Sequence, residues 1–365
     1  MKILRKYILL ECILPFFLSL SVLTSVFLLG YLIKLANMVI NKGVSLALVG
    51  QVFLYYIPYV LTYTLPIACL MAIILAFSRF STDNEILAMR ANGIRLKNLL
   101  WPIFMMGLIL SLFSIILNIK IIPHAYHQQR KLLKEVGTKN PTALLEAGTF
   151  IKDFKDQILF IYRIDGNKMY NIRIYQPQPD GKMTRTITAK EGEFTQVPGE
   201  DKIKLKLISG TSDEPDLENP NNFYKLKFNT FFRTLDLSKA NNKKIEKKPQ
   251  GMTLKEVQEK IKELDALGID DVIPLRIEFH RKLVWAFAVL IFMMLGLPLA
   301  VVTHRREKTA NVALAVLCAV SYYLLTLGCQ ALCVQNNTPI AITMWAPNII
   351  GAVIAFVLNY RLCAS

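Results

Sequence analysis

The chain has 365 residues, with 43 Lys and Arg against 27 Asp and Glu, which gives a formal net charge of +16 at pH 7. Yet 53% of its residues are hydrophobic and only 19% are charged. This combination excludes the usual basic nucleic-acid-binding protein, whose excess cations lie in a polar and highly charged domain.

The charge is divided unevenly along the chain. Residues 123–282 contain 29 of the Lys and Arg and 23 of the Asp and Glu, which leaves 14 cations and 4 acids for all other residues. The polar segment has the composition of a water-soluble domain. The rest of the chain consists of apolar runs that are typical of membrane spans.

Six apolar runs without a charged side chain are long enough to cross a membrane, since about 20 helical residues span a hydrocarbon core of about 30 Å. They cover residues 12–33, 51–78, 98–119, 283–302, 309–334 and 338–360. The first run is too long for a signal-peptide core and lacks a small-residue cleavage site, so we expect it to be retained as a span. Three spans therefore precede the polar segment and three follow it.

The short loops on alternate sides of these spans differ in their content of Lys and Arg. Eleven of these cations lie on the side of the two chain ends, whereas the opposite short loops contain only Lys34 and Lys42. Cytoplasmic loops carry the excess of Lys and Arg in membrane proteins. We therefore expect both termini to be cytoplasmic and the polar segment to be exported.

The exported segment has the period of β-strands. Ile203, Leu205 and Leu207 alternate with lysines, which predicts strands with one apolar and one wet face. Strands are expected over 149–152, 158–164, 171–175, 185–189, 202–207 and 224–228. Their spacing indicates a sandwich or an open barrel. The apolar interior would be either a closed, packed core or a space that parts to hold a lipid tail, and the pattern does not separate the two.

A connecting helix is expected over 253–265, after the last strand. Thr253 and Glu256 have the spacing of a capping box, and an apolar stripe follows. The helix would lie on the membrane surface or against the sheet, and its simplest role is that of a connector.

The loop between spans two and three predicts a short cytoplasmic helix over 83–93. Asp83 is a natural N-cap, and Asn92-Gly93 ends the helical run. We expect three apolar side chains to be exposed to the cytoplasm, namely Ile86, Leu87 and Met89. Such a helix suits docking into a groove of a partner, although a plain connector is the simpler alternative.

Motifs of known catalytic chemistry are missing from the sequence. It contains no Gly-x-x-x-x-Gly-Lys-Ser/Thr loop, no His-Glu-x-x-His and no Gly-x-Ser-x-Gly. We therefore expect no enzyme activity, no ATP site in this chain, no cofactor and no metal site.

Several motifs, in order along nearly the whole chain, resemble the family of lipopolysaccharide-export permeases, the LptF/LptG proteins. They are Tyr7-x-x-x-Glu11-x-x-x-Pro15, Leu65-Pro66, Asp83-x-Glu85-Ile86-x-Ala88-x-Arg90-Ala91-x-Gly93, Gly148-x-Phe150, Glu278-Phe279-His280-x-Lys282, Leu295-Gly296-Leu297-Pro298-Leu299, Tyr322-Tyr323 and Trp345-x-Pro347-Asn348. The resemblance implies an α-helical membrane protein with six transmembrane helices (3+3) and an inserted periplasmic β-jellyroll domain. Its parts would be residues 1–122, 123–282 and 283–365.

The resemblance also implies a function. The chain would be the permease subunit of an ABC transporter that extracts lipopolysaccharide from the bacterial inner membrane and passes it to a periplasmic bridge toward the outer membrane. Its partners would be a paralogous permease, a cytosolic ABC ATPase dimer and a single-span periplasmic jellyroll protein, with no nucleic acid. The alternative is a mechanical or signalling subunit that is coupled to an ATPase without moving lipid.

Site residues follow from the same resemblance. The coupling helix would use Asp83, Glu85, Ile86, Leu87, Met89, Arg90 and Gly93, with Glu85 and Arg90 as the contacts to the ATPase. The lipid-binding residues would be Lys34 and Lys42 near the lipid A phosphates, and Ile203, Leu205 and Leu207 in the β domain. For Lys34 the alternative is a side chain that merely reaches the membrane interface.

Overall fold

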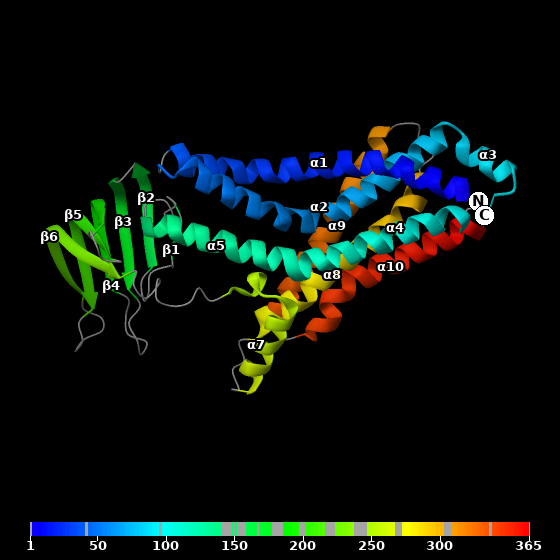
Figure 1. Cartoon of the computed structure of the whole chain (residues 1–365). Coiled ribbons are helices and arrows are strands. Elements are labelled where there is room, and N and C mark those ends of the chain that lie inside the picture. The colour runs from blue at the N-terminus through cyan, green and yellow to red at the C-terminus, as the bar shows by residue number, and fades with distance from the viewer. Residues whose placement is uncertain are drawn as a thin grey trace. The chain divides into compact units, whose positions relative to one another are not determined.

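The computed structural model forms two compact units (Figure 1). One comprises Met1–Leu32, Phe53–Gln128 and Lys247–Ser365, and the other comprises Ile33–Val52 and Gln129–Glu246. The structure describes residues 2–40, 43–94, 97–139, 148, 150–151, 158–165, 168–176, 185–196, 202–215, 223–236, 247–266, 272–302, 308–335 and 338–364.

Long apolar helices dominate the first unit. They are α1 (Lys2–Ile40), α2 (Leu46–Thr82), α4 (Lys97–Ile116), α8 (Ile273–Val302), α9 (Lys308–Gln335) and α10 (Ile340–Ala364). The end of α1 and the start of α2 belong to the second unit. α4 continues through a π-helix, η1 (Leu117–Ile121), into α5 (Ile122–Lys139). Among the described residues, six helices are long and apolar enough to cross a membrane, three before the β-strands and three after them. This confirms the predicted arrangement of spans.

The six helices differ in how much of their surface the protein covers. In the most apolar stretches of α2 and α8, 72% of residues are buried, against 11% in α1 and 22% in α9 and α10. α2 and α8 approach closely, since a Cβ on Gly296 would lie 2.8 Å from Ile73. α1 and α9 expose many large apolar side chains, which suits contact with lipid or with another apolar helix.

Both chain ends lie at the same end of this unit as the short helix α3 (Glu85–Ala91), as Figure 1 shows. Leu362, near the C-terminus, belongs to the same core cluster as Ile8, near the N-terminus, and Ile86 of α3. The termini and the loop between α2 and α4 therefore share one side of the helix bundle.

The strands of the second unit form one antiparallel sheet in which each strand pairs with the next. They are β1 (Phe150–Ile151), β2 (Ile158–Asp165), β3 (Lys168–Gln176), β4 (Arg185–Gln196), β5 (Lys202–Pro215) and β6 (Phe223–Asp236). All six predicted strands are confirmed, and β2 to β6 are each longer than predicted. The inserted β domain is confirmed as well, whereas the jellyroll connections stay a prediction because the described strands follow one another as a meander.

Among the described strands, pairing is interrupted along one line that crosses the sheet. The positions on this line are Tyr162, Asn171, Lys190, Ser209 and Asn229. Asn171 and Ser209 have φ angles of 51° and 54°, a left-handed conformation that interrupts the regular pleat. The buried positions shift by one residue there, so that Met169 and Ile172, three residues apart, both face inward.

This line is a crease, because side chains from both sides of it enter one core cluster. The cluster contains Leu159, Ile161, Met169, Ile172, Ile174, Ile187, Ala189, Leu205 and Leu207. At the crease a Cβ on Gly210 would lie 2.4 Å from the Thr188 carbonyl oxygen and 2.4 Å from the Phe228 ring, so only glycine fits. Within the described strands, a single creased sheet thus encloses the apolar core.

The predicted connecting helix is present as α7 (Leu254–Ala266), preceded by a turn of 3-10 helix, η3 (Pro249–Gly251). The Thr253 amide N–H donates to the Glu256 carboxylate over 2.9 Å, which confirms the capping box. The apolar stripe of α7 packs with Leu275 and Phe279 at the start of α8. Residues 247–282 thus group with the membrane helices, and the predicted domain boundary at 282 differs from the division of the units.

Candidate functional site

The helix α3 begins one residue later than the sequence suggests. Its N-cap is Asn84, in the left-handed region at φ 57°, and no side chain caps the helix. The prediction that Asp83 is the N-cap is therefore wrong. Its carboxylate lies 3.7 Å from the Nε atom of Arg79, so it faces the end of α2.

The predicted end of α3 is confirmed. Gly93, at φ 74°, donates its N–H to the Arg90 carbonyl over 2.9 Å, and Ile94 donates to the Met89 carbonyl over 3.0 Å. These two bonds form a Schellman motif, which needs a left-handed residue and so favours glycine.

The prediction that three apolar side chains of α3 are exposed is only partly right. Leu87 is 66% exposed, but Ile86 is buried and Met89 packs against the same core. The short helix is held to the bundle by this pair, because their spacing of three puts them on one face. Its outer face offers Leu87 and Arg90.

A polar cluster, here called the α3 cluster, joins α3 to α1 and α2. The Tyr7 hydroxyl donates to the Glu85 carboxylate, 3.1 Å from both oxygens. Arg79, near the end of α2, donates to the Tyr7 oxygen over 3.4 Å and pairs with Glu11 over 2.7 Å. The α3 cluster thus comprises Tyr7, Glu11, Arg79, Asp83 and Glu85.

The α3 cluster changes the interpretation of Glu85. Its carboxylate is engaged by Tyr7 of α1, 78 residues away in the chain, and is half-buried. Glu85 therefore fixes α3 to α1, while Arg90 remains on the exposed face. A displacement of α3 would be transmitted to α1 through Tyr7 and to α2 through Arg79.

The predicted lipid-binding residues fall into three situations. Lys34 lies on the exposed surface of α1, whereas Lys42 and the side chain of Ile203 lie outside the described residues. Leu205 and Leu207 are fully buried in the core of the β unit. An acyl chain would reach them only if the two parts of the creased sheet move apart.

The core of the β unit is open along its last strand. Leu226 of β6 pairs with Ser212 of β5, so both side chains leave the sheet on the same face. Ser212 is buried, whereas Leu226 is 53% exposed and Tyr224, on the same face, is 60% exposed. Apolar groups of the inner face are thus accessible at this edge.

Sequence reasoning assigned no role to several residues that the structure brings together. Tyr7 and Glu11 share a helix face through their spacing of four residues, which was a usable signal. Arg79 was counted only for its charge. Glu278, Arg281 and Lys282 are charged residues at the edge of an apolar run, and they too form contacts, described below.

The comparisons with known proteins agree with the fold. Residues 6–361 match the family described as lipopolysaccharide export system permease LptF/LptG. No curated protein matches the chain. Because the family match covers nearly the whole sequence, including α3 and the strands, the chain belongs to the LptF/LptG family of lipopolysaccharide export permeases.

Proposed function

We propose that this chain is the membrane subunit through which a separate cytosolic ATPase drives lipopolysaccharide out of the bacterial inner membrane toward a periplasmic bridge. In this assembly it pairs with a paralogous permease and is joined by a single-span periplasmic jellyroll protein. Both termini and α3 face the cytoplasm, and the β unit faces the periplasm.

The observation that carries this proposal is the α3 cluster. A helix of seven residues that only connects two spans does not need polar bonds to both α1 and α2. Here Glu85 is bonded to Tyr7, and Arg79 links Tyr7 with Glu11. With Leu87 and Arg90 outward, α3 can receive a partner on one face and pass its displacement to two spans on the other.

The membrane-spanning surfaces support the same proposal. α1 and α9 leave most of their apolar length uncovered within the chain, which suits a lateral opening toward lipid and toward a second permease. Lys34 lies at the end of α1 that faces the periplasm in this orientation, where its ammonium would meet a lipid A phosphate.

The β unit supplies an apolar path for the acyl chains. In this proposal the chains enter where Leu226 and Tyr224 are accessible and move along the inner face toward Leu205 and Leu207 as the sheet opens at its crease. At rest Leu205 and Leu207 are buried, so this part of the inner face is protected from water between transport cycles.

A photo-crosslinking amino acid placed at Leu226 tests the proposal in the assembled complex. We expect adducts with lipopolysaccharide that increase during ATP turnover. The matched control is Lys227, the next residue, which is exposed on the opposite face and should give none. If a complex that hydrolyses ATP gives no adduct at Leu226, the alternative of a mechanical subunit without lipid transport is favoured.

A further inference from the structure

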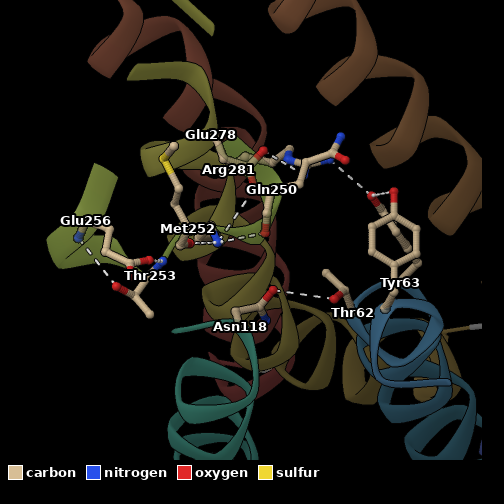
Figure 2. Close-up of polar contacts among 11 residues, drawn as sticks. Thr62, Tyr63, Asn118, Gln250, Met252, Thr253, Glu256, Glu278 and Arg281 are labelled. Atoms are coloured by element: carbon tan, nitrogen blue, oxygen red, sulfur yellow. Dashed lines mark hydrogen bonds and ion pairs between the residues drawn. The ribbon is translucent and has the colours of Figure 1, made fainter. Parts of the chain in front are cut away.

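Three charged side chains are buried in the first turns of α8 (Figure 2). Glu278 and Lys282 are 6% and 5% exposed, and the Arg281 side chain is 17% exposed. The Glu278 carboxylate lies 2.6 Å from Arg281 Nη2 and 3.8 Å from Lys282 Nζ. Buried charges are tolerated when they are paired and hydrogen-bonded, so both cations are already engaged within the protein.

The two cations reach different parts of the chain. Lys282 donates to the Met252 carbonyl over 2.6 Å and to the Gln250 carbonyl over 3.4 Å. These carbonyls lie just after Lys247, where the chain returns from the β unit to the helical unit. Arg281 donates through Nη1 to the Tyr63 hydroxyl of α2 over 3.2 Å. Glu278 thus links α2 to the segment that returns from the β unit.

The residue next to Tyr63 contacts the outgoing connection. The Thr62 hydroxyl donates to Asn118 Oδ1 over 3.4 Å, and Asn118 Nδ2 donates to the Ser114 carbonyl over 2.9 Å. Asn118 is buried in the π-helix η1, through which the chain passes from α4 into α5 and onward to the β unit. Single π-turns inside helices are often found at functional sites.

These contacts form one site, here called the α8 junction. It comprises Thr62, Tyr63, Asn118, Glu278, Arg281 and Lys282, which all line one cavity of about 20 Å³. That volume has room for a single water molecule. Pro66 lies one turn along α2 and has no N–H, so the helical hydrogen bond that the Thr62 carbonyl would accept is missing there.

We propose that the α8 junction couples movement of α2 to both connections of the β unit, with Thr62 and Tyr63 as positioning residues for transport. The inference rests on the proposed function. α2 carries Arg79 of the α3 cluster toward one end and the α8 junction roughly 24 Å away along its axis. A displacement of α2 therefore acts on the outgoing helix through Asn118 and on the returning segment through Arg281, Glu278 and Lys282.

The chemistry of the junction is suited to this role. Replacing a buried ion pair by apolar side chains is often neutral or stabilising, so stability alone gives no reason for charges at this place. Directional bonds between fixed partners do transmit a displacement, whereas apolar contacts allow sliding. Pro66 in α2 and the π-helix η1 between α4 and α5 both interrupt regular α-helix and permit local bending. They lie beside Thr62 and at Asn118, which are hydrogen-bonded to each other.

The test uses the whole complex in lipid vesicles with its ATPase and a periplasmic acceptor, and it measures lipopolysaccharide transferred per ATP hydrolysed. The variant is Thr62→Val with Tyr63→Phe. It removes both hydroxyls but keeps the Tyr63 ring, which packs on Trp285 with 4.9 Å between centroids. We expect ATP hydrolysis within twofold of the natural protein and transfer per ATP reduced at least fivefold.

Two matched controls separate coupling from folding. Thr62→Ser keeps the hydroxyl and leaves Tyr63 unchanged, so it should transfer as much lipopolysaccharide per ATP as the natural protein. Tyr323→Phe removes the hydroxyl of a neighbouring tyrosine, whose ring lies 6.5 Å from that of Tyr63, and should leave the lipopolysaccharide transferred per ATP unchanged.

The outcomes are distinct. An unchanged ratio in the double variant, with the natural complex active, would overturn the inference while leaving the proposed function standing. Equal losses of hydrolysis, transfer and assembly would also overturn it, because they indicate a merely structural role. If the natural complex hydrolyses ATP but transfers no lipopolysaccharide, the proposed function itself fails.

Discussion

α2 takes part in both the α3 cluster and the α8 junction, and the surroundings of these two sites differ. At the α3 cluster, Arg79 and Glu11 expose 46% and 29% of their side chains. At the α8 junction, Glu278 and Lys282 are almost completely buried. Exposed ion pairs contribute about 0–1 kcal/mol, whereas removing one partner of a buried pair costs about 3–5 kcal/mol. Similar side chains therefore make weak, exposed contacts at the α3 cluster and strong, buried contacts at the α8 junction.

The largest effect is expected from Glu278→Ala. It leaves Arg281 and Lys282 buried without their carboxylate, so we expect the free energy of unfolding in detergent to fall by about 3–5 kcal/mol. The control is Glu259→Ala, on the exposed side of α7, which should change it by less than about 0.5 kcal/mol. A loss at Glu278 no larger than at the control would abolish the contrast between the two places.

An intermediate effect is expected at the capping box of α7, which begins one residue after the Met252 carbonyl that Lys282 binds. Thr253→Ala should lower the free energy of unfolding by about 1 kcal/mol and speed amide hydrogen exchange in the first turn of α7. Exchange in α8 is the internal control. Unchanged exchange in that turn would show that the cap does not hold α7.

The same cap has a pH dependence. Burial alone would raise the pKa of Glu256, but its bonds to Lys247 and Thr253 together hold the pKa below its usual value. The contribution of a carboxylate with a lowered pKa is present above its unfolded pKa of about 4.3 and is lost as the pH falls through the folded value. The protection factors of the α7 amides, which compare exchange with its intrinsic rate at each pH, should therefore be constant near neutral pH and fall only in acid.

A smaller effect is expected from the bond between Tyr7 and Glu85. Tyr7→Phe and Glu85→Gln should each lower lipopolysaccharide-stimulated ATP hydrolysis up to about tenfold, the equivalent of roughly 0.5–1.5 kcal/mol for one hydrogen bond. The double variant should be no worse than the more affected single one, because both remove the same bond. Additive losses would mean that Glu85 acts through another partner. The control is Tyr360→Phe, which changes an exposed tyrosine near the C-terminus.

The smallest effect is expected from Glu11→Gln, which removes the exposed ion pair with Arg79. We expect the free energy of unfolding to fall by about 0–1 kcal/mol in low salt. The difference should vanish in about 1 M salt, where the Debye length is about 3 Å. A loss that persists in high salt would show that this pair is as rigid as the buried one.

Local patterns in the sequence predicted the elements well. Apolar runs located the spans, alternation located the strands, and the Thr253 and Glu256 spacing located the start of α7. The N-cap of α3 was missed because Asp83 turns its side chain toward Arg79 of the preceding helix, and such a contact has no local signal. Ile86 and Met89 were placed outside because a helix of seven residues has too few positions to define an apolar face.

The sites depended on partners far away in the chain. Glu85 meets Tyr7, Arg281 meets Tyr63 and Asn118 meets Thr62, each across more than 50 residues. The sequence marked Glu278 and Lys282 only as charges at the edge of a span. The spacings of three and four residues from Glu278 to Arg281 and Lys282 did offer a local signal for ion pairs. No local pattern indicated that Arg281 would donate to Tyr63, or that Lys282 would donate to the backbone carbonyls of Gln250 and Met252.

What the sequence alone determined is the number of spans, their division around a β domain and the positions of the strands, because each follows from the period and length of local runs. What the tertiary structure decided is which apolar helices lie inside. α1 and α2 have the same peak hydropathy of 2.3, yet 11% of one and 72% of the other is buried within the chain. Lipid tails are as apolar as a protein core, so hydropathy cannot distinguish the two, and only packing does.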